Sequence, residues 1–112
     1  MTDLEYLSHA ESVLAAVEAT CDRLNERADV DIDNQRSGGM LTLTFADHSQ
    51  IVINLQKPLQ EIWLASQKQA YHYKFNSGKW LSTKGQSEFF ADLSRDASVQ
   101  AGQVLGFAAS AN

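Results

Sequence analysis

Two neighbouring segments, residues 40–45 and 50–56, alternate apolar and polar side chains around a short polar connection at residues 47–49. Alternation with a period of two is typical of a strand that buries one face, and two such strands around a short loop favour a β-hairpin. The leucines of the first strand and the isoleucines of the second must then share one face. This hairpin constrains the fold most, because a sheet with one apolar face needs a second layer to cover it.

The segments on either side extend this sheet. Residues 62–65, 71–75 and 79–81 are short strand-like runs separated by polar or Gly-containing turns, which predicts successive antiparallel strands. Residues 29–33 alternate acidic and β-branched side chains, which predicts a half-buried or edge strand whose three carboxylates point the same way. The strands therefore form an antiparallel meander.

Helical periodicity replaces alternation at the two ends of the chain. Residues 3–28 and residues 87–100 carry apolar side chains at steps of three and four, and each has a single apolar stripe. Both helices must therefore cover the same sheet face. The sequence predicts an α+β fold, a two-layer α-β sandwich with the N- and C-terminal helices packed on one face of an antiparallel meander sheet. We expect residues 1–112 to form one domain, with residues 104–112 as a short tail that lies on it or frays.

The other sheet face is then left to water. By strand parity, it carries mostly polar side chains around one tryptophan, and a tryptophan among amides and threonines is typical of an interface anchor. The residues expected on this face are Thr42, Thr44, Val52, Asn54, Gln56, Trp63, His72 and Lys74.

Charge is distributed unevenly along the chain. The formal net charge is -5, but the first 33 residues alone carry -7 and the remainder carries +2. Nucleic acid is not an expected partner, because duplex binding needs a basic surface. A cation or a basic protein surface fits better. No apolar run is long enough to cross a membrane, and the first residues do not resemble an export signal, so we expect a soluble cytoplasmic protein with no membrane partner.

Candidate chemical groups are few. Cys21 is the only cysteine, which excludes intramolecular disulfides, and its position on the apolar stripe predicts a core residue. The three histidines share no helix or strand face, so no histidine metal cluster is expected. No nucleophile elbow or phosphate-binding loop occurs, so the sequence indicates no enzyme active site.

An acidic stripe on the first helix remains. Glu11, Glu18 and Asp22 border its buried face, and acidic residues continue into the following segment. This pattern has two interpretations: an ordinary solvated surface with a charged edge strand, or a weak electrostatic site for hard cations, which prefer carboxylate oxygen.

The order of these elements and several short segments together resemble the bacterial branch of the frataxin family. Residues 38–45, 51–58 and 60–65 carry the resemblance most specifically, and it extends over most of the chain, from about Leu4 to Gln103. The resemblance implies the sandwich described above. It also implies a non-enzymatic role in iron–sulfur cluster assembly, in which iron and the cysteine desulfurase are bound and the desulfurase is regulated or supplied with iron.

The resemblance further implies particular site residues. Ferrous or ferric iron is expected at weak, multiple sites on an acidic ridge, without an organic cofactor. The ridge residues are Glu11, Glu18, Asp22, Glu26, Asp29, Asp31 and Asp33. The expected partners are the cysteine desulfurase and the iron–sulfur scaffold protein, and without iron the chain is expected to be a monomer. The partner-binding residues are Asn54, Gln56, Trp63 and His72.

Two alternatives remain open at this stage. One is a ferroxidase that stores iron in oligomers, although the Glu-x-x-His pairs of di-iron bundles are absent from the sequence. The other is a pure adaptor that acts through Asn54, Gln56 and Trp63, with incidental iron binding.

Overall fold

The structure is a computed structural model that describes residues 1–27 and 30–109. In the described residues, two α-helices and six strands follow one another along the chain in the order expected from the sequence, and a short 3-10 helix that was not expected lies between the third and fourth strands. The elements are α1 (Asp3–Arg27), β1 (Asp33–Ser37), β2 (Met40–Thr44), β3 (Gln50–Gln56), η1 (Lys57–Leu59), β4 (Glu61–Ala65), β5 (Ala70–Asn76), β6 (Lys79–Ser82) and α2 (Phe89–Ala101).

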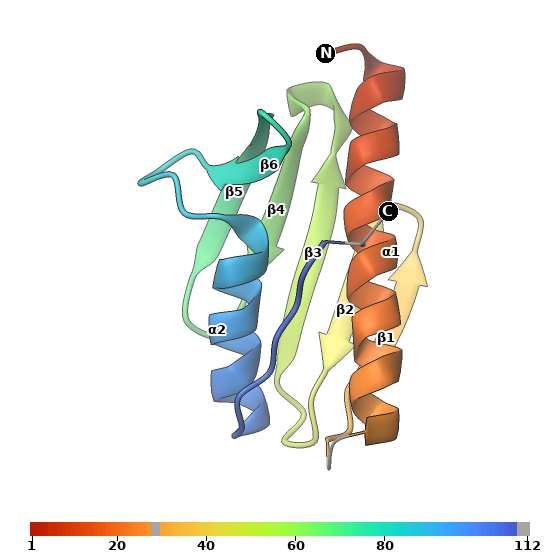
Figure 1. The fold of residues 1–112 in the computed structure, drawn as a ribbon, viewed down its shortest axis with the longest axis vertical. Coiled ribbons are helices and arrows are strands. Elements are labelled where there is room, and N and C mark those ends of the chain that lie inside the picture. Colours follow the sequence, from red (N-terminus) through yellow and green to blue (C-terminus); the bar gives the residue numbers. More distant parts are fainter. Residues whose placement is uncertain (28–29, 110–112) are drawn as a thin grey trace.

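The six strands form a single antiparallel meander in the order β1-β2-β3-β4-β5-β6. Both helices lie on the same face of this sheet, with α1 towards β1 and α2 towards β5 and β6 (Figure 1). The α+β two-layer sandwich is therefore confirmed. Both helices pack on the same face because each helix has one apolar stripe and the sheet has one apolar face.

The leucines and isoleucines of the central hairpin share one face, as predicted. Leu41 lies opposite Ile53 and Leu43 lies opposite Ile51, and all four side chains are fully buried beneath the helices. On β4, Ile62 and Leu64 are also buried, whereas Trp63 between them points to the opposite face. Alternation along each strand thus separates a core face from an open face.

The first strand begins later than the alternation predicts. Residues 30–32 are not a strand, and the strand β1 starts at Asp33; residue 29 lies outside the described residues. Asn25 explains this, since its side-chain amide donates to the Ile32 carbonyl and accepts from the Ile32 N–H, both at 2.9 Å. The last paired residue of β2, Thr44, lies opposite Asp33, so the hairpin offers no partner to earlier residues.

The C-terminal helix has defined ends. The Glu88 carboxylate accepts hydrogen bonds from the N–H groups of Phe90 and Ala91 at 2.9 and 3.1 Å, which satisfies donors of the first turn. Gly102 ends the helix with a φ of 74°, a conformation that glycine adopts without steric cost. The helix therefore starts two residues later than the predicted residue 87 and ends one residue after the predicted residue 100.

The chain after α2 turns back and lies on the domain. Ser94 Oγ accepts from the Phe107 N–H at 2.8 Å and Ser98 Oγ accepts from the Leu105 N–H at 2.9 Å, while both apolar side chains are buried. Figure 1 shows this segment running between the two helices. Of the predicted tail, residues 104–109 lie on the domain, and residues 110–112 are outside the described part of the chain. No helix within the described ranges has the length and apolar character needed to span a bilayer.

Candidate functional site

We use the name acidic ridge for Glu11, Glu18, Asp22 and Glu26 of α1 together with Asp31 and Asp33. Three helix carboxylates of this ridge, those of Glu11, Glu18 and Asp22, lie against the edge strand β1. Arg36 pairs with Glu11 and, at 3.3 Å from Nη1 to Oε1, with Glu18. Two residues earlier on the same strand, the side-chain amide of Asn34 donates to Asp22 Oδ1 at 3.2 Å. The stripe read from the helix periodicity is therefore real, and basic and amide side chains of β1 contact it.

The sheet register explains these contacts. Arg36 lies opposite Leu41 and Asn34 lies opposite Leu43, and both leucines point into the core beneath the helices. Residues that lie opposite one another in an antiparallel pair point to the same face, so Arg36 and Asn34 point towards the helix layer. Asp33 alternates with Asn34 and therefore points to the open face.

The structure thus brings together only part of the predicted ligand set. Glu11, Glu18 and Asp22 form one row, whereas Asp33 lies on the other side of β1 and Asp31 precedes the strand. Asp29 lies outside the described residues. The interpretation of residues 29–33 as one strand face is therefore wrong for its described part, because the strand does not extend that far.

The ridge does not form a closed metal cage. Within residues 1–27 and 30–109, no group of three histidine, cysteine or acidic side chains is placed to hold a metal ion. The Glu18 and Glu11 side chains are 30% and 46% exposed, so their charges are partly screened by water. What the arrangement offers chemically is a negative surface with adjustable carboxylates. The assignment of individual ligands stays a prediction.

The second candidate surface is the open sheet face, which we define as Asn54, Gln56, Glu61, Trp63, His72 and Lys74. The Trp63 and His72 rings stack with centroids 4.1 Å apart and planes inclined by 7°. The register explains the stack, because Asn54, Trp63 and His72 lie side by side on β3, β4 and β5. One face of the Trp63 ring is therefore covered by His72, while the side chain as a whole is only half-buried.

Glu61 was not among the residues predicted for this surface. The Trp63 indole N–H donates to Glu61 Oε1 at 2.7 Å, and Lys74 Nζ lies 3.2 Å from Oε2. His72 Nδ1 is 3.8 Å from the same carboxylate. The two-residue spacing to Trp63 places Glu61 on the open face, so parity could have found it, but its side chain is only 9% exposed, which parity does not indicate.

The pKa of Glu61 is lowered from its ordinary value. Burial opposes ionisation, but the hydrogen bonds from Trp63 and Lys74 and the positive charge of Lys74 outweigh it. Glu61 is therefore a charged group that fixes the orientation of Trp63.

Cys21 lies in the core, as predicted. Its side chain is fully buried, and burial, with smaller contributions from Asp22 and Glu18, raises the pKa of the thiol to about 12. The thiolate that nucleophilic chemistry requires is thus disfavoured. The histidines are spread over the molecule, since His9 stacks on Phe75 with ring centroids 4.2 Å apart and His48 occupies the hairpin turn.

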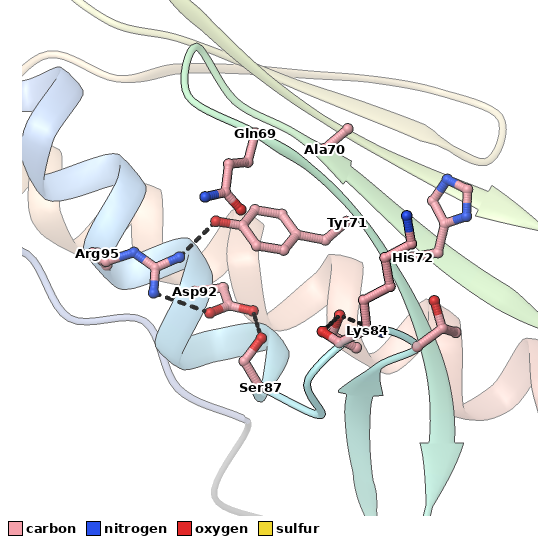
Figure 2. A pocket seen from close by; sticks show the side chains of 10 residues that line it. Gln69, Ala70, Tyr71, His72, Lys84, Ser87, Asp92 and Arg95 are labelled. Atoms are coloured by element: carbon pink, nitrogen blue, oxygen red, sulfur yellow. Dashed lines mark hydrogen bonds and ion pairs between the residues drawn. The ribbon is translucent and has the colours of Figure 1, made fainter.

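A cavity of about 410 Å³ opens between β5 and α2, as Figure 2 shows. Asp92 lies on its wall and is buried. Its carboxylate accepts from the hydroxyls of Tyr73 at 2.9 Å and Ser87 at 2.6 Å, and it lies 3.3 Å from Arg95 Nη1. Burial, followed by the hydrogen bond to Asp92, raises the pKa of Tyr73.

Asp96, one turn further along α2, is buried in the same way. It accepts from the hydroxyls of Ser66 at 2.7 Å and Tyr71 at 3.1 Å, and from Arg95 Nε at 3.2 Å. In Figure 2 the Tyr71 and Arg95 side chains point towards one another across the cavity, whereas His72 points away from them. Among the described residues, no buried side-chain nitrogen or oxygen lacks a partner. We conclude that this network fastens α2 to the sheet.

Comparison with known proteins decides the family. Residues 1–103 match the frataxin-like domain. The chain belongs to the frataxin-like family. Two relatives of this frataxin-like chain are named iron-sulfur cluster assembly protein CyaY. The one from Polaromonas sp. is 64% identical over 96% of this chain and 92% of the relative. The one from Verminephrobacter eiseniae is 61% identical over 97% of this chain and 100% of the relative.

Solved structures agree with this assignment. Frataxin from Psychromonas ingrahamii is 33% identical and has a TM-score of 0.83, covering 96% of this frataxin-like chain and 99% of the other. A trimeric frataxin from Saccharomyces cerevisiae, described as complexed with ferrous, is 25% identical with a TM-score of 0.74 over 85% of this chain and 87% of the yeast chain. The family resemblance read from the sequence is therefore confirmed.

Proposed function

We propose that this frataxin-like protein is a non-enzymatic iron-binding protein of iron–sulfur cluster assembly that regulates the cysteine desulfurase, donates iron, or does both through the acidic ridge. The observation that carries the proposal is the row of Glu11, Glu18 and Asp22 along α1 beside β1. The names of the two bacterial relatives support the role in cluster assembly, and the yeast frataxin with ferrous supports the choice of metal.

The ridge acts by electrostatics in this proposal. Iron is a hard cation in its aquated forms and prefers carboxylate oxygen, and clustered carboxylates attract it without a rigid cage. Such sites are weak and multiple, and salt screens them. The same negative surface attracts a basic surface of the desulfurase, so iron and the partner compete for it.

The open sheet face supplies a second contact in the same proposal. Trp63 is held by Glu61 and by the stack on His72, so it can be buried by a partner at a low cost in side-chain entropy. We assign this face to the desulfurase and the scaffold protein together. A pure adaptor that uses only this face is the second candidate, and the fixed tryptophan favours it. Both candidates place the chain in the cytoplasm, as a monomer in the absence of iron.

Two double variants with the same change in net charge test the role of the ridge. Glu18→Gln with Asp22→Asn removes two ridge charges, whereas Ala91→Lys with Val99→Lys adds two positive charges at exposed positions of α2. Binding of ferrous iron under anaerobic conditions and of the cysteine desulfurase is measured by calorimetry at about 20 mM and about 500 mM salt.

We expect the ridge variant to weaken both interactions severalfold at low salt, and the control to leave iron binding within about twofold of wild type, since the control adds its charges on α2 and removes no carboxylate of the ridge. The difference should shrink at high salt. Equal effects of the two double variants would contradict a specific role of the ridge.

A further inference from the structure

Arg36 occupies the centre of the acidic ridge. Its guanidinium pairs with Glu11 and Glu18, which are seven residues apart on α1 and therefore about 10 Å apart along the helix axis. Its Nε donates to the Gly38 carbonyl at 3.3 Å. All three guanidinium nitrogens are thus engaged, and the side chain is 28% exposed. The ridge already contains a cation that belongs to the chain.

The fold, rather than the local sequence, puts Arg36 there. Arg36 lies opposite the buried Leu41, so alternation directs its side chain to the helix layer. The turn after β1 supplies the Gly38 carbonyl, which fixes the near end of the guanidinium. A guanidinium that the strand backbone and the Gly38 carbonyl already orient loses less entropy when it pairs with the carboxylates, so it competes well with a free ion.

We infer that Arg36 is an internal counter-ion that competes with external cations for Glu11 and Glu18. The inference rests on the proposed function and specifies how the ridge is regulated. A metal ion or a basic partner group that binds this end of the ridge must displace the guanidinium, so binding there is an exchange of cations. Among the described residues, Glu26 and Asp31 form no ion pair, so a cation that binds near them does not have to displace a basic side chain.

A purely structural role for the same ion pairs makes a different prediction. If Arg36 only fastens β1 to α1, removing it lowers the stability of the fold. The affinity for cations then changes no more than it does when any other positive charge is lost. Competition instead predicts a gain in affinity confined to the two carboxylates that Arg36 contacts.

The experiment compares two arginine variants that lose the same charge. Arg36→Gln removes the competitor, and Arg23→Gln removes an arginine of α1 that contacts only Thr20, at 3.5 Å, among the described residues. The full chain is titrated with Mn²⁺ at low salt, and paramagnetic broadening of backbone amides reports where the ion binds. Circular dichroism verifies that each variant is folded.

We expect Arg36→Gln to bind Mn²⁺ at Glu11 and Glu18 about 2- to 30-fold more tightly than wild type, the range that two partly exposed ion pairs represent. Arg23→Gln should stay within about twofold. Equal gains in the two variants refute the competition. Should Arg36→Gln not fold, the wild-type Arg36 Nε–H resonance is followed on addition of Mg²⁺; shifts of the Glu11 and Glu18 amides without movement of this resonance also refute it.

The proposed function is judged separately by the wild type. Broadening near Glu26 and Asp31 in the wild type supports the ridge as a cation surface whatever Arg36→Gln does. Without any broadening at the ridge in the wild type, the proposed function fails. Arg36→Gln still decides the inference in that case: new broadening at Glu11 and Glu18 supports competition, and none refutes it.

Discussion

Replacing Glu61 tests whether this carboxylate holds the open sheet face in shape. Glu61→Gln keeps a side-chain oxygen that can accept from the Trp63 indole but removes the charge opposite Lys74. Glu61→Ala removes the acceptor as well and leaves the indole N–H without its 2.7 Å partner. The two variants therefore separate the ion pair from the hydrogen bond.

The expected magnitudes follow from the exposure of each partner. A hydrogen bond to a charged group contributes about 1.5–3 kcal/mol, and a pair with an exposed lysine contributes about 0.2–1 kcal/mol. The Lys74 side chain is more than half exposed, so its contribution lies in the lower range. We expect Glu61→Gln to lower the free energy of unfolding by about 1 kcal/mol and Glu61→Ala by about 2 kcal/mol.

The effect must depend on pH in a definite direction. The pKa of Glu61 is lower in the folded chain than its ordinary value of 4.5, so the charged form stabilises the fold above that value. This stabilisation is lost as the pH falls through the lowered pKa. The difference between wild type and Glu61→Gln should therefore be present near pH 7 and smallest at the acid end of a titration.

Urea unfolding followed by circular dichroism across this pH range measures the effect. Glu26→Gln is the matched control, since Glu26 is exposed and forms no ion pair among the described residues, and it should change stability by less than about 0.5 kcal/mol. The reasoning is refuted by an unchanged stability of Glu61→Gln near pH 7, or by a loss of stability that persists unaltered in acid.

Two further predictions concern Trp63 and Cys21. Trp63→Ala should reduce binding of the desulfurase at least tenfold in calorimetry, as expected for a central aromatic anchor, while the ferrous titration of the ridge stays unchanged; loss of both would mean that the two surfaces are not independent. Cys21, with its pKa raised to about 12, should resist alkylation by iodoacetamide near pH 8 and react at least a hundredfold faster in denaturant; rapid reaction of the folded chain would contradict its burial.

The sequence predicted those parts of the fold that depend on local pattern. Alternation predicted that the leucines of β2 and the isoleucines of β3 share one core face, and helical spacing predicted both helices to within two residues at either end. The prediction of a strand failed at residues 30–32, because the Asn25 side chain forms the hydrogen bonds of the Ile32 backbone. Alternation reports only which side chains are apolar, whereas a strand also needs a neighbouring backbone with which to form hydrogen bonds. The strand β2 ends at Thr44 and is too short to pair with residues 30–32.

The candidate site was predicted less completely, because its charges are arranged by tertiary contacts. Asp92 lies between the apolar positions of the helical pattern, and the pattern gives no sign that hydroxyls from β5 and from the segment before α2 allow it to be buried. The position of Arg36 follows only from the register of β1, which the sequence misplaced. Glu61 could be assigned to the open face by parity, but its role depends on Trp63 and Lys74.

The meander order has a consequence for how the chain folds. Every strand pairs with its neighbour in sequence, so each hairpin closes a short loop, and contacts across long stretches of chain come mainly from the helices. One such contact joins the Tyr6 hydroxyl to the Glu61 carbonyl at 2.7 Å, across 55 residues. Docking of the first helix therefore anchors the backbone of the residue whose side chain holds Trp63, and a chain whose first helix is displaced should not present the tryptophan correctly.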